Sequence, residues 1–585
     1  MKVNICKYKD KITYYLAKTI RKGKKITTKN FERIGTHQEL LLKHPDPLKY
    51  CKEYAKEKTK AEKQDLLEKY TVYFKKQQFE PIQVDSNSEL YNVGYFFLKY
   101  FYDKLKIKSF LGNLTKDSKI KYNPNTSFEY LVYSRILNPK SKRGSFSDFK
   151  NFYGKPESQF QDIFKTMDLF NIFLKDFQIH LYKESNNIIK RDTTTLYYDC
   201  TNYFFETDNE TELLKYGVSK EHRPNPIVQM GLFMDGSGVP LMFDIFPGNQ
   251  NEQRTPIELE NNIIKDFKIS KFIYCADAGL GANSTRLFNS IKNRDFLVTQ
   301  SLKKLKKEDL NLVMTDDNWY DPETMRNDIC LSELDDDDDK IYIKILPVNN
   351  PIDIGYKEYT RNMQIKKKSD FNQTVIVSFS KKQQKFQRQV RQKQIARASN
   401  LILKGRVEKE SENSPKRFIK KLNEKNTYIL DYEKIGYEAQ FDGFYAVATS
   451  LDKDYKSISN IMRRRWQIEE CFRILKTNLK ARPVFHRDED RIKVHFLICF
   501  VALLIYRILE KKLEYKYSIN QIIKALNETV VLPVNNGANY IAGYKGSEIL
   551  TDLNRVCEKE LDYPIFLNTE LNSQKYATYK KEIKK

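Results

Sequence analysis

The middle of the chain alternates between segments patterned as strands and segments patterned as helices. Residues Thr195–Phe205 are rich in aromatic and β-branched side chains, which are typical of a strand. Two apolar runs, Pro226–Met234 and Val239–Phe246, flank the sequence Asp235-Gly236-Ser237-Gly238, which is a strong hairpin signal. The pattern therefore predicts three antiparallel strands in succession.

A helix, a strand, a second helix and a further strand are predicted after this hairpin. Thr255–Phe267 has helical periodicity, and Lys271–Ala276 is an apolar run typical of a buried strand. The next helix and strand are predicted at Asn283–Lys292 and Phe296–Gln300. This order is that of a ribonuclease-H-like α/β core, in which the first and fourth strands are neighbours.

The segments on either side of this core have weaker patterns. Residues 1–36 predict a small β-hairpin followed by a charged helix, and the pattern from Tyr91 to Lys190 is helical. Between the two parts of the core, strands are predicted at Lys340–Ile345, Thr374–Phe379 and Tyr445–Thr449. We divide the chain into six segments: 1–85 (N-terminal β-hairpin and helix), 86–190 (helical), 191–300 (first part of the core), 301–450 (β-rich insertion), 451–515 (second part of the core) and 516–585 (C-terminal helical tail).

Composition narrows the class of protein and of partner. At 585 residues the chain is too long for one hydrophobic core, so several structural units are expected. A formal net charge of +25 favours a polyanionic partner, because neutralised phosphates release counterions, although lysine-rich composition also fits an A+T-rich genome.

The eight cysteines have no zinc spacing, and the six scattered histidines give no support to a Ser/His/Asp hydrolase. The chain starts with charged residues, and its longest apolar run, Phe496–Tyr506, is too short to span a membrane, so we expect a cytoplasmic protein.

Two aspartates stand where the strand pattern does not favour them. Asp199 lies inside the Thr195–Phe205 strand, although aspartate is depleted in strand interiors because its side chain competes for backbone hydrogen bonds. Asp277 follows the Lys271–Ala276 strand directly and precedes a glycine turn, the position at which α/β sheets carry active-site carboxylates. Taken alone, each aspartate is more readily explained by a structural role. Taken with the order of the elements and a third acid, the two aspartates favour a catalytic role.

The third acid is Glu469, in the basic segment Arg463–Lys476. At 3.6 residues per turn, Glu469 lies within roughly 60° of three cations on one helix face. These cations are Arg465, Arg473 and Lys476. A metal-binding carboxylate and phosphate-binding cations would then point the same way, whereas Glu470 would point elsewhere. The alternative is an exposed charged helix stabilised by Arg–Glu pairs.

Together these residues resemble the Asp-Asp-Glu transposases of bacterial insertion sequences, in the group with a β-rich insertion before the glutamate. The signature of that group is Tyr-x2-Arg-x3-Glu-x6-Lys. Arg465, Glu469 and Lys476 match it, whereas its tyrosine position holds Met462. Further similarity lies in Tyr198-Asp199-Cys200-Thr201, Tyr216-Gly217-Val218-Ser219-Lys220, Phe246-Pro247-Gly248-Asn249, Ala276-Asp277-Ala278-Gly279 and Arg482-Pro483-Val484-Phe485-His486.

The resemblance implies catalytic roles for Asp199, Asp277 and Glu469. These carboxylates would hold two Mg²⁺ or Mn²⁺ ions, because hard oxygen ligands select such cations. The protein would bind double-stranded DNA at the element's terminal inverted repeats, cleave it, and join the freed 3′-hydroxyl to target DNA. Arg465, Arg473 and Lys476 would contact the DNA. Cleavage of paired ends predicts a homodimer that acts on DNA in the bacterial cytoplasm, away from membranes.

Several alternatives stay open. A transposase-derived DNA-binding protein would keep the fold and charge, and a structure-selective nuclease of the same fold would keep the carboxylates but lack strand transfer. The helical segment 86–190 either binds the DNA ends or packs against the core. Trp319, one of only two tryptophans, either stacks on an unpaired DNA base or belongs to the core of the insertion.

Overall fold

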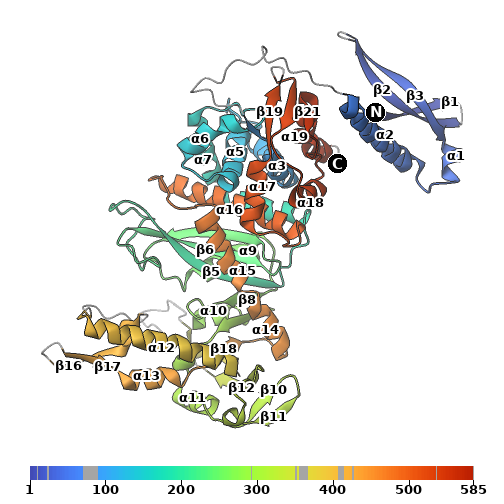
Figure 1. Ribbon diagram of the computed structural model, residues 1–585. Helices are drawn as coiled ribbons and strands as arrows, with labels where there is room; N and C mark the ends of the chain where they lie inside the picture. The colour runs from blue at the N-terminus through green and yellow to red at the C-terminus, as the bar shows by residue number, and fades with distance from the viewer. Residues whose placement is uncertain are drawn as a thin grey trace. The chain divides into compact units, whose positions relative to one another are not determined.

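The protein consists of two compact units, Met1–Glu89 and Leu90–Lys585 (Figure 1). The computed structural model describes residues 1–8, 11–22, 25–69, 90–291, 293–349, 352–354, 367–369, 371–405, 407, 414–423, 427–534 and 537–583. Parts of the predicted segments therefore lie outside the described residues: 9–10, 23–24 and 70–85 of the first segment, 86–89 of the second, the last residue of the helix expected to end at Lys292, several stretches of the insertion between 350 and 426, and 535–536 and 584–585 of the C-terminal tail.

The first unit is a three-stranded sheet with two helices, and not the predicted hairpin with one. Its elements are β1 (Lys2–Tyr8), β2 (Lys11–Lys22), β3 (Lys25–Thr36), α1 (His37–Leu41) and α2 (Pro47–Lys69). The strands are antiparallel in the order β1-β2-β3. The third strand escaped prediction because Lys25–Thr36 is mostly Lys, Thr and other polar residues, without a clear apolar alternation.

A ten-stranded sheet forms the centre of the second unit. In spatial order its strands are β11 (Arg326–Ile329), β10 (Trp319–Asp321), β12 (Tyr342–Asn349), β15 (Asn372–Phe379), β18 (Phe444–Thr449), β9 (Asp295–Thr299), β8 (Ile273–Ala276), β5 (Thr195–Phe204), β6 (Ile227–Asp235) and β7 (Pro240–Pro247). Strands β5, β8 and β9 run parallel to one another, and the other pairs are antiparallel. The predicted adjacency of the first and fourth strands is confirmed, since β5 pairs with β8.

The segment expected as an insertion continues this sheet rather than forming a separate one. Strand β18 pairs with β9 and carries β15, β12, β10 and β11 beyond it. The described residues of 301–450 also form two small two-stranded sheets and three α-helices. These are β13 (Ile352–Ile354) with β14 (Lys367–Ser369), β16 (Ile419–Asn423) with β17 (Thr427–Leu430), α11 (Lys307–Val313), α12 (Lys381–Leu403) and α13 (Tyr432–Ala439).

Alternate residues of β5 face two different layers of helices. Leu196, Tyr198 and Cys200 belong to a core shared with α9 (Thr255–Asp266). Tyr197 and Tyr203 belong to a core shared with α15 (Trp466–Arg473) and α16 (Glu489–Lys512). Since strand side chains alternate between faces, Asp199 lies on the face covered by α15. The remaining helices near the sheet are α10 (Asn283–Phe288) and α14 (Tyr455–Arg463).

Helix α16 is the central core helix. By length and composition it could cross a membrane, alone among the helices of the described residues, but 94% of its apolar window is buried inside the protein. It lies between the sheet and the helices α5 and α7 (Figure 1). Burial on all sides explains why its sequence is apolar almost throughout.

The helical segment and the C-terminal segment fold together. The former comprises α3 (Tyr95–Lys104), α4 (Ile107–Thr115), α5 (Pro124–Leu137), α6 (Lys142–Asp148), α7 (Phe160–Ile172) and α8 (Leu174–Asn186). The latter comprises α17 (Ile519–Glu528), β19 (Val530–Val534), β20 (Asn539–Ala542), α18 (Glu548–Cys557), β21 (Ile565–Leu567) and α19 (Asn568–Ile583). The prediction of a helical tail is incomplete, because this segment also contains three short strands that form a sheet with β4 (Tyr91–Asn92) in the order β21-β20-β19-β4. The pairing of β19 with β4 joins distant segments and leaves no local signal, whereas β19 and β20 flank Asn536-Gly537, a hairpin signal that the prediction missed.

Candidate active site

Asp199 and Asp277 lie at matching positions on two neighbouring parallel strands. The register pairs Tyr197 of β5 with Cys275 of β8, and each aspartate follows two residues later. Because side chains repeat every two residues along a strand, both aspartates lie on the same face as Tyr197 and Cys275. The Tyr197 hydroxyl donates to the Ile461 carbonyl (2.9 Å), and Cys275 contacts Met462 through sulfur (3.7 Å), so this face meets helix α14.

Glu469 reaches the same place from helix α15. The helix buries Ile468, Cys471 and Phe472 against the core, which leaves Glu469 exposed beside them. An Arg465 nitrogen lies 3.3 Å from the Glu469 carboxylate and 3.9 Å from that of Asp277. One guanidinium therefore links the acid on the helix to the acid on β8. We call Asp199, Asp277 and Glu469 the carboxylate site.

The three acids differ in burial, and this changes their electrostatics. Burial raises the pKa of Asp199 to about 6, against the opposing effects of Lys220, the Cys200 backbone N–H and Arg465; the Glu469 charge adds to the rise. The side chains of Asp277 and Glu469 are 53% and 55% exposed. Each aspartate accepts one hydrogen bond of 2.8 Å from the next backbone N–H, of Cys200 and Ala278 respectively.

The donor set of this site fits a hard divalent cation in kind. It contains carboxylate oxygens from three elements and neither thiolate nor imidazole, which is the chemistry that Mg²⁺ and Mn²⁺ prefer. Across the described part of the chain, no three His, Cys, Asp or Glu side chains already surround a position for one ion. The Arg465 guanidinium occupies the space between Asp277 and Glu469, so binding of a cation would require this side chain to move.

Two of the cations expected beside Glu469 have other partners. Arg473 pairs with Glu470, one turn before it, rather than with Glu469. Lys476 lies 3.6 Å from Glu221 and over the Tyr203 ring. Arg473 still lies within α15 and keeps the α-helical spacing, but its side chain turns to Glu470. Lys476 leaves the predicted common face because α15 ends at Arg473 and the backbone continues as a π-helical turn, Ile474–Asn478. Its i→i+5 hydrogen bonds break the α-helical spacing on which the prediction depended.

Trp319 is a core residue, so its assignment as a DNA-binding residue is corrected. Its side chain is fully buried among Phe379 and Phe444, and its indole N–H donates to the Thr315 carbonyl (3.1 Å). Neither ring face is available to an unpaired base. Met462, at the signature's tyrosine position, is also partly buried against the core and presents no hydroxyl to the site.

A charged group beside the carboxylate site was not assigned from the sequence. Lys220 donates to the Cys200 carbonyl and lies 3.5 Å from Glu252, while Glu221 pairs with both Lys476 and Arg482. Lys220 is the last residue of the Tyr216–Lys220 motif, which is part of the family resemblance. The sequence therefore marks Lys220 as a residue of interest but does not indicate that it lies beside Asp199.

Residues 214–505 match the family model of the transposase DDE domain. This part of the chain is similar to a transposase DDE domain. The matched range includes Asp277 and Glu469 and begins after Asp199. The fold is also similar to the transposase in a cryo-EM structure of the piggyBac transposase synaptic complex with hairpin DNA, at 10% identity and a TM-score of 0.34, over 84% of this chain and 86% of that chain. No protein with a curated description matches the chain.

Proposed function

We propose that this protein is the transposase of a bacterial insertion sequence, which binds the ends of the element, cleaves the DNA and joins the 3′-hydroxyl ends to target DNA. The observation that carries the proposal is that Asp277 and Glu469 share the Arg465 guanidinium beside Asp199 on the neighbouring strand, in a chain whose residues 214–505 match the transposase DDE domain. The strand order β7-β6-β5-β8-β9 supports a ribonuclease-H-like catalytic core.

In this proposal the carboxylate site holds divalent cations. Asp199, Asp277 and Glu469 would be the ligands, and cations bound there would activate the attacking hydroxyl and stabilise the leaving oxygen. Arg465 would leave the carboxylates and turn to a DNA phosphate, since a guanidinium binds carboxylate and phosphate in the same geometry. Lys476, half-buried beside Glu221, would contact the backbone near the same position.

The partners follow from the same reaction. The substrate would be double-stranded DNA that carries the element's terminal inverted repeats, and the net charge of +25 suits such a polyanion. Two ends processed together would require two copies of the chain, so we propose a homodimer in the synaptic complex. The protein would act in the bacterial cytoplasm.

Joining of DNA ends is the test of this function. A duplex with a free 3′-hydroxyl at the element's end, taken from the inverted repeats that flank the gene, is incubated with a supercoiled plasmid and Mg²⁺. We expect plasmid-joined product from the unmodified protein, and none from Asp277→Asn or in the presence of EDTA. Nicking without joining would instead identify a structure-selective nuclease, and binding with neither reaction a DNA-binding derivative.

A further inference from the structure

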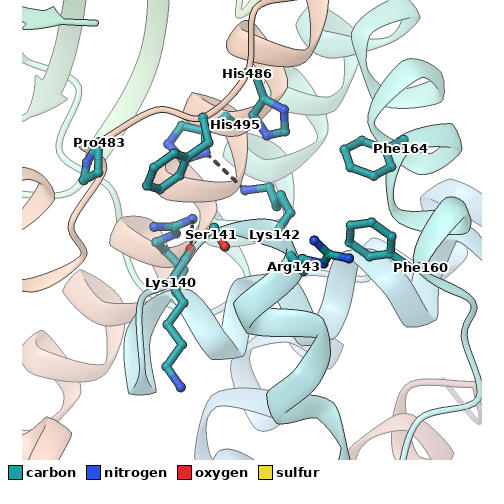
Figure 2. A pocket seen from close by; sticks show the side chains of 11 residues that line it. Lys140, Ser141, Lys142, Arg143, Phe160, Phe164, Pro483, His486 and His495 are labelled. Carbon is teal, nitrogen blue, oxygen red and sulfur yellow. Dashed lines mark hydrogen bonds between the residues drawn. The ribbon is translucent and has the colours of Figure 1, made fainter. Parts of the chain in front are cut away.

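A cavity of about 350 Å³ lies between the helical segment and the chain that follows the catalytic helix. Figure 2 shows Lys142 reaching from α6 toward His495 on α16, near Phe160 and Phe164 of α7. Its wall also includes Arg135, at the end of α5, and the loop at Pro483. We call this cavity the phosphate pocket; it is lined by Arg135, Lys140, Ser141, Lys142, Arg143, Phe160, Phe164, Pro483, Phe485, His486 and His495.

The lining of the pocket is rich in cations and contains no acid. Four of its side chains are Arg or Lys, two are His, and none is Asp or Glu. One lining cation, Lys140, is already paired with an acid outside the lining, Asp148, which leaves Arg135, Lys142 and Arg143; Asp168 pairs with Arg491, which is not part of the lining. A cavity with this lining is complementary to an anion.

Lys142 is the most informative of these cations. It is 5% exposed, and its ammonium donates to Nδ1 of His495 (3.1 Å). Nε2 of His495 donates to the Ala481 carbonyl (2.9 Å), so the ring is a neutral acceptor at Nδ1 and offers Lys142 no negative charge. Burial, assisted by the Arg135 charge, lowers the pKa of Lys142 to about 7. A buried ammonium without a counter-ion is costly, and an anion would offset this cost.

Arg135 adds a second buried cation. It is 4% exposed and donates to the carbonyls of Leu479, Lys480 and Lys140. These acceptors are neutral, and its Nε has no hydrogen-bond partner among the described residues. Leu479 and Lys480 directly follow the π-helical turn of the catalytic helix, so Arg135 joins the pocket to the segment that carries Glu469.

We propose that this pocket binds a phosphate group of the DNA backbone. Buried Lys142, buried Arg135 and exposed Arg143 would surround the phosphate oxygens, as Arg and Lys commonly do at phosphates. Phe160, Phe164 and Phe485 would line the space beside the attached sugar. The inference rests on the proposed function, because the attachment to the catalytic segment favours DNA over a free phosphate as the source of the group.

The test compares three variants of the full chain with the unmodified protein. Lys142→Gln removes the buried charge, and Arg143→Gln removes an exposed charge of the same pocket without altering the core. Lys524→Gln, on α17 and outside the pocket, is the control for loss of one charge. Two quantities are measured without divalent cations: the Tm in potassium phosphate against KCl at equal ionic strength, and the Kd for a DNA duplex of arbitrary sequence at several KCl concentrations.

We expect phosphate to raise the Tm of the unmodified protein and of Lys524→Gln, but not of Lys142→Gln. We also expect each pocket variant to lower the slope of log K against log salt by about 0.9, the value for one lost phosphate contact, and to weaken DNA binding at low salt by about tenfold. Unchanged slopes in both pocket variants would overturn the proposal. If phosphate still stabilised the protein through Lys142 while the slopes were unchanged, the pocket would be a site for free phosphate and not for DNA.

Failure of this inference is distinguishable from failure of the proposed function. The measurements need no cleavage and no divalent cation, so an inactive carboxylate site would leave them unchanged. Conversely, a pocket that does not bind phosphate would leave joining of DNA ends intact at saturating DNA.

Discussion

The carboxylate site and the phosphate pocket concentrate opposite charges in opposite surroundings. Asp277 and Glu469 are about half exposed and share the Arg465 guanidinium. Lys142 is almost fully buried, and its nearest partner is a neutral imidazole. Water and the Arg465 guanidinium therefore compensate the charges of Asp277 and Glu469 before any metal binds, whereas the buried Lys142 ammonium has no anion to compensate it. The comparison indicates that the carboxylate site exchanges the Arg465 guanidinium for a divalent cation. The phosphate pocket instead gains an anion that the folded chain does not supply.

Removal of an aspartate from the carboxylate site should have the largest effect on activity. It should also distinguish catalysis at the carboxylate site from DNA binding elsewhere on the protein. We expect Asp199→Asn or Asp277→Asn to lower Mg²⁺-dependent nicking of end-containing DNA by more than about 100-fold, since loss of a direct ligand should exceed the usual loss from outer-shell changes. DNA binding should change by less than about twofold, because no phosphate contact is removed. Nicking rates and Kd values for the same duplex check this. Equal losses of both would contradict the division of roles.

Arg465 offers a sharper test of cation exchange. In Arg465→Gln, Asp277 and Glu469 keep their charges but lose the guanidinium between them, so a divalent cation should bind more readily in the absence of DNA. We expect addition of Mg²⁺ to raise the Tm of this variant by about 1–2 °C more than that of the unmodified protein. Arg473→Gln, which leaves the Arg465 contacts in place, is the control. The idea fails if both variants respond equally to Mg²⁺.

The smallest expected effect is the pH dependence that Lys142 contributes to stability. Its folded pKa of about 7 is below the usual lysine value of about 10.4, so between these values the unfolded chain binds more protons. Stability should then rise with pH across this window, and the cost of burying the charge is fully present below pH 7. In chloride buffers, we expect the Tm of the unmodified protein to rise relative to that of Lys142→Met between pH 6 and pH 9. In phosphate buffers, this difference in Tm should depend less on pH. A flat difference in chloride would contradict an uncompensated Lys142.

Much of the catalytic core could be predicted, because the local pattern of apolar and polar residues is enough to locate its strands and helices. The runs around Asp199 and Asp277, the Asp235–Gly238 hairpin and the following helix all appear as strands and helices close to their predicted bounds. The extension of the sheet by β18, β15, β12, β10 and β11, and the sheet that β4 forms with the C-terminal strands, could not be predicted in the same way. Both depend on pairings between segments far apart in the chain.

The candidate site was predicted well where it depended on strands and less well where it depended on helical spacing. Parallel pairing brings Asp199 and Asp277 together, and Arg465 reaches Glu469 at the expected i,i+4 distance. Lys476 departs from the expected face because a π-helical turn follows α15, and no residue type in Ile474–Asn478 signals such a turn. Arg473 keeps the helical spacing but pairs with Glu470, a choice of partner that spacing alone does not decide. The phosphate pocket was not predicted, since its lining comes from four separate stretches of the chain.

The central claim is that Glu469, and not its neighbour Glu470, acts with the two aspartates. Glu469 faces Asp277 through Arg465, whereas Glu470 pairs with Arg473. Glu469→Gln and Glu470→Gln each remove one charge from the same helix at nearly constant size, so each is the control for the other. The most direct measurement is Mg²⁺-dependent nicking of a duplex bearing the element's end by the two purified variants. The account predicts loss of nicking, by more than about 100-fold, in Glu469→Gln and most of the activity retained in Glu470→Gln. An active Glu469→Gln beside an inactive Glu470→Gln would contradict it.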